Sequence, residues 1–148
     1  MTARPRTGYG AYAELPGTFE AAGRARELTR CALGDDHPSL ADVALVVSEL
    51  VTNSVTHSRS GRPGGTLIVG IETAARGEVR VQVRDAGSAG APVRADADQG
   101  SEHGRGLAII AALADDWGTT AGPAGRSTWA RLRAGRHAGR DEPEREAG

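Results

Sequence analysis

The stretch VVSELVTNSVTHS, Val46 to Ser58, has the period of a buried helix but also carries a carboxylate and an amide. At 100° per residue the buried side of this helix is a single arc, formed by Val43, Val46, Val47, Leu50 and Ser54. Glu49 and Asn53 are four residues apart, so they share a face at the edge of that arc. A carboxylate at the edge of a core needs a partner. In the structural interpretation Glu49 bonds to a neighbouring arginine and Asn53 to a backbone group; in the functional interpretation the two side chains bind a ligand.

Length and composition restrict the classes of protein that this chain can belong to. Its 148 residues are enough for one domain with a real core, and the net charge of −1 provides no field to attract nucleic acid or an anionic membrane. A single cysteine, Cys31, excludes an internal disulfide framework, and the four scattered histidines lack zinc-ligand spacing. No apolar stretch resembles a signal peptide or a membrane span, so we expect a cytoplasmic protein.

The basic residues are all arginine, because the chain contains no lysine. A phosphate-binding P-loop needs its lysine, and a protein kinase of the eukaryotic type uses one to hold the nucleotide phosphates. Schiff-base chemistry also needs an amine. The sequence therefore excludes these three chemistries in their usual form.

Hydrophobic periodicity predicts an α+β fold. Helices are expected at 18–33, 40–57 and 104–115, and strands at 11–15, 66–72, 78–85, 117–121 and 126–134. Thr18 and Ser39 are the predicted N-caps of the first two helices. The order of elements predicts a two-layer sandwich in which helices cover one face of a mostly antiparallel sheet. We expect this domain to span 10–134, between a flexible N-terminus (1–9) and a disordered tail (135–148).

Two further patterns change the interpretation of the helix that carries Glu49. In VRDAG, 83–87, an alternating strand ends in Asp-x-Gly, and in GRGLAII, 104–110, glycines open a helix after a long aperiodic loop. Each pattern alone is common, but together they describe one site. An amide oxygen suits Mg²⁺, and a carboxylate beside it can accept a proton from an attacking hydroxyl. A strand-end aspartate can accept a hydrogen bond from an exocyclic amino group, and a glycine-rich helix start can hold phosphates. The combination predicts an ATP site that needs no lysine.

Three motifs carry a resemblance to a known family. Glu49-x-x-x-Asn53, Asp85-x-Gly87 and Gly104-x-Gly106-Leu107 resemble the N, G1 and G2 boxes of the GHKL (Bergerat-fold) ATPases. Over roughly 15–132 the sequence looks most like those of the short, free-standing anti-sigma-factor kinase-like ATP-binding proteins of actinomycetes. The resemblance implies the Bergerat ATP-binding fold.

The resemblance also implies a role for each matching residue. Asn53 would ligate Mg²⁺, and Glu49 would be the general base. The residues that it implies for the nucleotide are Asp85 at the adenine amino group, Gly87 beside the base, Gly104, Arg105, Gly106 and Leu107 at the phosphates, and Thr128, which would help to hold Asp85 and the base through water. We interpret His57, one turn after Asn53, as structural. After Gly87 the next glycine is Gly90, and the loop that follows is shorter than in larger relatives.

Two functions of different classes fit these residues. The first is a serine/threonine protein kinase of the anti-sigma type, which binds a sigma factor and phosphorylates a serine of an anti-anti-sigma partner. By the resemblance it would contact neither nucleic acid nor membrane directly, and it could form a homodimer. The second is a non-catalytic module whose affinity for its partner depends on bound ATP. A purely structural origin of the motifs, without a ligand, is the third hypothesis.

Overall fold

The computed structural model describes residues 10–87 and 102–133, which form five strands, three α-helices and two short 3-10 helices. In chain order these are β1 (Gly10–Pro16), α1 (Glu20–Leu33), α2 (Leu40–His57), η1 (Arg59–Gly61), β2 (Thr66–Thr73), η2 (Ala75–Gly77), β3 (Val79–Asp85), α3 (Glu102–Leu113), β4 (Asp116–Gly122) and β5 (Gly125–Leu132). The predictions for 1–9, for 88–101 and for the tail lie outside the described residues.

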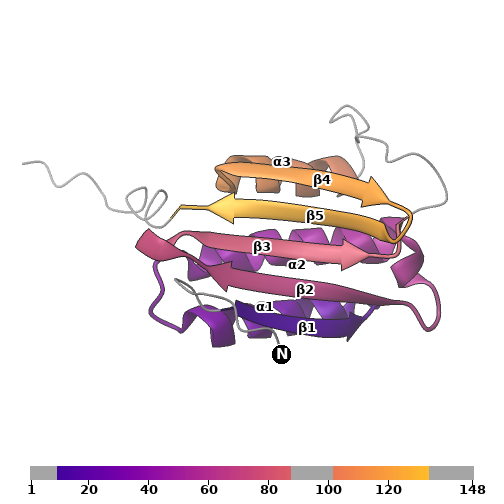
Figure 1. The fold of residues 1–148 in the computed structure, drawn as a ribbon, viewed down its shortest axis with the longest axis horizontal. Helices are drawn as coiled ribbons and strands as arrows, with labels where there is room; N and C mark the ends of the chain where they lie inside the picture. The colour runs from indigo at the N-terminus through magenta and orange to yellow at the C-terminus, as the bar shows by residue number, and fades with distance from the viewer. Residues whose placement is uncertain (1–9, 88–101, 134–148) are drawn as a thin grey trace, which may run out of the picture.

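The strands form one antiparallel sheet in the order β1-β2-β3-β5-β4. All three helices lie behind this sheet in the view of Figure 1, with α2 behind its centre. The strand order places β3 in the middle, between β2 and β5, so the end of β3 is flanked by both neighbours. The predicted α+β sandwich is therefore confirmed.

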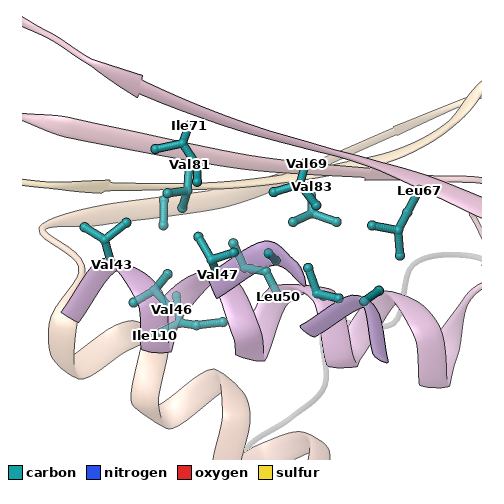
Figure 2. Close-up of a cluster of buried hydrophobic side chains, with 14 of the residues drawn as sticks. Val43, Val46, Val47, Leu50, Leu67, Val69, Ile71, Val81, Val83 and Ile110 are labelled. Atoms are coloured by element: carbon teal, nitrogen blue, oxygen red, sulfur yellow. The ribbon is translucent and has the colours of Figure 1, made fainter. Parts of the chain in front are cut away.

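The core lies between α2 and the inner face of the sheet, as Figure 2 shows. The arc predicted on α2 is buried throughout, and its valines and leucine point at the inner side chains of β2 and β3. Ile110 of α3 joins the cluster next to Val46. Because α2 is buried on this side, the edge that carries Glu49 and Asn53 has a fixed orientation relative to the sheet.

The strict alternation predicted for β3 is also confirmed. Its three valines are fully buried on the face toward the helices. On the other face, the Arg80 guanidinium lies 5.2 Å from the centre of the Trp129 ring, and Gln82 Nε2 donates to Ser127 Oγ at 2.8 Å. Side chains alternate along a strand, so Asp85 continues the row of buried valines. A carboxylate therefore ends this buried apolar row.

The prediction and the structure differ at several ends of elements, among them the starts of α1 and α3. Thr18 is not the N-cap of α1, because Phe19 holds that position without a side-chain cap bond. Thr18 instead belongs to the turn after β1, where its N–H donates to the Pro16 carbonyl at 2.8 Å. Ser39 does occupy the N-cap of α2, but its side chain makes no cap bond. No helix within 10–87 or 102–133 is long and apolar enough to cross a membrane.

Candidate functional site

The first part of the candidate site lies where α3 meets the edge of α2. Glu49 and Asn53 are half-buried there, while Leu50 between them is buried in the core. Gly106 of α3 is buried against both polar side chains. A methyl group at Gly106 would lie 2.7 Å from Glu49 Oε2 and 3.5 Å from Asn53 Oδ1. Because glycine has no side chain, α3 can approach the carboxylate this closely while Glu49 keeps its observed position.

This contact joins two motifs that are about fifty residues apart in the sequence. Helix α3 begins at Glu102, two residues before the predicted start. Gly104 and Arg105 therefore lie within its first turn, among the four residues whose backbone N–H groups have no partner inside the helix. Helix boundaries depend on the backbone hydrogen bonds that form, and glycines in a first turn do not prevent them. The positive end of the α3 dipole thus lies close to Glu49 and Asn53.

One structural role for Glu49 would be an ion pair with an arginine. Among the side chains that the structure describes, the arginines that form ion pairs bind other acids, and none of these pairs includes Glu49. The half-buried Glu49 carboxylate and Asn53 amide both lie against Gly106 of α3, and each offers a hard oxygen donor. Such a donor set fits Mg²⁺, which takes one or two protein oxygens and completes its shell with water and phosphate.

The second part of the candidate site is the end of β3. The Asp85 side chain is only 1% exposed, and both of its oxygens accept hydrogen bonds. Oδ1 accepts from the Gly87 N–H at 2.7 Å, and Oδ2 accepts from Arg126 Nη2 at 3.0 Å. Each carboxylate oxygen has two lone pairs, so Asp85 keeps acceptor capacity for a further donor.

The turn after Asp85 is held in place by the segment that follows α2. Gly87 has a φ of +75°, a conformation that glycine adopts readily. Its carbonyl accepts from the Arg59 N–H at 2.8 Å, and the Ala86 N–H donates to Ser60 Oγ at 2.8 Å. Ser60 is fully buried, although the sequence shows it only as one residue of a turn-rich connection. The end of α2 and the end of β3 are thus one hydrogen-bonded unit.

Sequence reasoning also missed Arg126. In the antiparallel pair of β3 and β5, Arg126 stands directly opposite Asp85, whereas Thr128 stands opposite Val83. Thr128 Oγ1 lies 3.3 Å from Thr119 Oγ1 of β4, so its hydroxyl contacts the edge strand on the side away from β3. Removing one member of a buried ion pair typically costs about 3–5 kcal/mol, against about 1.5–3 kcal/mol for a hydrogen bond to a charged group. Each residue of this pair therefore depends on the other to keep its charge compensated.

The remaining predicted residues lie at the periphery. Leu107 is half-buried and packs against the core from α3. His57 is exposed at the last turn of α2, where a cavity of about 340 Å³ is lined by Thr56, His57, Arg59 and Arg62, among others. This cavity contains none of the residues predicted to bind a nucleotide or a metal.

Comparison with known proteins gives the family of the fold. The family model described as a histidine kinase-like ATPase domain matches residues 15–133. One similar solved structure contains the RsbU and RsbW domains of Rv1364c from Mycobacterium tuberculosis, with 26% identity, 85% of this chain covered and a TM-score of 0.65. Another is the histidine kinase domain from the Erythrobacter litoralis EL346 blue-light activated histidine kinase, with 20% identity, 85% of this chain and 66% of that chain covered, and a TM-score of 0.54.

The chain spans about a third (32%) of the length of the first of these structures. No curated protein matches the sequence significantly. The family model nevertheless covers most of the chain, and both solved structures share its fold. The chain therefore belongs to the histidine kinase-like ATPase family, the Bergerat-fold (GHKL) ATPases.

Proposed function

We propose that the chain binds Mg·ATP and is a serine/threonine protein kinase of the anti-sigma type. It would bind a sigma factor and transfer the γ-phosphoryl group of ATP to a serine of an anti-anti-sigma partner. Membership in the histidine kinase-like ATPase family supports nucleotide binding, and the similarity to a structure with an RsbW domain supports the anti-sigma type.

The observation that carries this proposal is the position of Gly106 against Glu49 and Asn53. There a carboxylate, an amide and the N–H groups of the first turn of α3 lie close together, and this arrangement supports the proposal. Phosphoryl transfer asks a protein mainly for positioning and for neutralisation of charge, which these groups supply.

Each residue has one task in the proposed reaction. Asn53 would ligate Mg²⁺, which when bound neutralises phosphate charge. The first turn of α3, with Gly104 and Arg105, would hold the phosphates, and Asp85 would accept the adenine amino hydrogen. Glu49 would take the proton of the serine hydroxyl while the serine oxygen forms its bond to the γ-phosphorus. The bond from that phosphorus to the bridging oxygen breaks, and ADP leaves.

A transfer assay on a natural partner tests the proposal. The chain is purified from its native host together with bound proteins, and the complex is incubated with Mg²⁺ and γ-labelled ATP. We expect label on a serine of a bound protein, located by mass spectrometry. A chain that binds both ATP and its partners yet transfers no label would instead be the nucleotide-dependent binding module.

Gly106→Ala is expected to reduce phosphoryl transfer without lowering stability. The added methyl would lie 2.7 Å from Glu49 Oε2, and the carboxylate, as the end of a flexible side chain, must move away. A shift of about 1 Å in a reacting group can cost roughly 10²-fold in rate. Alanine also favours the helix over glycine by about 0.5–1 kcal/mol, which opposes any loss of stability. The transfer rate and the melting temperature measure the two effects separately.

Gly23→Ala is the matched control for this variant. Gly23 lies inside α1, and a methyl group there would meet only Arg26 Nη2, at 3.6 Å. We expect the same small gain in stability and an unchanged rate. Equal transfer rates for the two alanine variants would show that Glu49 does not need its observed position.

A further inference from the structure

Arg126 is the more exposed member of the ion pair that it forms with Asp85. Its side chain is 17% exposed, whereas that of Asp85 is 1% exposed. The two residues face each other across β3 and β5, on the side of the sheet toward the helices. A ligand that reaches Asp85 must therefore either displace the guanidinium or bind beside it.

Displacement would leave a buried carboxylate without its cation. The amino group of a base is neutral, so its hydrogen bond to Asp85 is weaker than the pairing with the guanidinium that it would replace. The balance favours a base that binds beside an intact ion pair. Asp85 can accept a further hydrogen bond, since the bonds from Gly87 and Arg126 leave lone pairs on both of its oxygens.

The guanidinium also has unused donors. It has five N–H groups in a rigid planar fork, and Nη2 is the atom that bonds to Asp85. Within the described part of the chain, Nε of Arg126 is buried without a hydrogen-bond partner. Nε itself is enclosed by the protein, but the other N–H groups of the fork can donate to a ligand atom that lies beside the ion pair.

We propose that Arg126 and Asp85 recognise adenine together, with Asp85 accepting from the amino group and Arg126 donating to the ring nitrogen beside it. This inference rests on the proposed binding of ATP and adds a specificity-determining residue to it. The Asp85 carboxylate is a hydrogen-bond acceptor and complements the amino group of adenine. The Arg126 guanidinium is a donor and complements the ring nitrogen on one side of that amino group, either N1 or N7. Guanine in the same pose presents O6 to the carboxylate and, on the N1 side, an N–H to the guanidinium.

The test compares ATP with two analogues that lack one ring nitrogen each, 1-deaza-ATP and 7-deaza-ATP. Affinities for the Mg²⁺ complexes are measured by calorimetry on the full chain, on Arg126→Ala and on Arg84→Ala. Arg84 is the matched control, because it precedes Asp85 on the same strand but is exposed on the opposite face, where it pairs with Ser127.

We expect the parent to bind one analogue at least tenfold or so more weakly than ATP. Arg126→Ala should bind ATP more weakly than the parent, by a factor of roughly ten or more. It should also no longer distinguish ATP from that analogue. Arg84→Ala should behave like the parent. Should Arg126→Ala fail to fold, Arg126→Lys keeps a positive charge beside Asp85 without the planar fork and should also lose ATP affinity.

Three outcomes would overturn the inference. The first is tighter or equal ATP binding by a folded Arg126 variant, which would show that the arginine competes with the base or does not touch it. The second is equal affinity of the parent for ATP and both analogues. In either case the parent still binds ATP, so the proposed function survives. The third is a parent that binds no adenine nucleotide, which removes the inference and the proposed function together.

Discussion

Replacement of Glu49 by glutamine is expected to slow phosphorylation of the partner serine by about 10²–10⁴-fold, the usual contribution of general-base catalysis. Glutamine keeps the size and hydrogen-bonding reach of the side chain but cannot take the proton of the hydroxyl. Glu49 is half-buried at the edge of α2, so a neutral amide there fits the observed packing. Single-turnover transfer of labelled phosphate measures the rate.

ATP affinity and melting temperature are the controls for Glu49→Gln. Both should stay close to the parent values, because Asn53 is assigned to the metal and the end of β3 is assigned to the adenine ring. A variant that phosphorylates its partner at the parent rate would show that Glu49 is not the base. A large fall in affinity would instead place Glu49 among the metal ligands.

Asp85→Asn is expected to weaken ATP binding by roughly ten- to a hundredfold. The loss of a hydrogen bond to a charged group costs about 1.5–3 kcal/mol, and each 1.4 kcal/mol is about a factor of ten in affinity. The amide keeps an oxygen for the Gly87 N–H but removes the anion that pairs with Arg126. We therefore also expect lower stability, by less than the 3–5 kcal/mol or so of a fully buried pair, because Arg126 is still partly exposed.

Asp116→Asn is the matched control for this second variant. Asp116 is the first residue of β4 and also pairs with an arginine, at 3.8 Å from Arg131 Nη2, but its side chain is 55% exposed. Exposed pairs contribute about 0–1 kcal/mol, so stability and ATP affinity should hardly change. Titrations are run well below the melting temperature of each variant. Unchanged affinity in folded Asp85→Asn would mean that the adenine binds elsewhere.

Local periodicity was enough to predict the parts of the site that lie on single elements. The arc on α2 follows from a spacing of 3.6 residues, so the half-buried positions of Glu49 and Asn53 could be read directly from the sequence. The burial of Asp85 follows in the same way from the alternation of β3. Neither inference needs a contact between distant residues.

The parts that could not be predicted depend on the register between distant strands. Arg126 pairs with Asp85 across 41 residues, and nothing local marks it among the eighteen arginines. Thr128 was assigned from its place in a motif, while the register puts it opposite Val83. Its proposed water-mediated role stays a prediction. Ser60 likewise acts through a backbone group 26 residues away.

Calorimetric titration of the parent chain with ATP and GTP, each with and without Mg²⁺, tests the central claim most directly. The claim is that the end of β3 selects adenine while α2 and α3 hold the metal and the phosphates. We predict that Mg·ATP binds at least about tenfold more tightly than Mg·GTP, since guanine presents an acceptor where Asp85 needs a donor. Removal of Mg²⁺ should weaken ATP binding as well. Equal affinity for the two nucleotides, or ATP binding that is indifferent to Mg²⁺, would contradict the account.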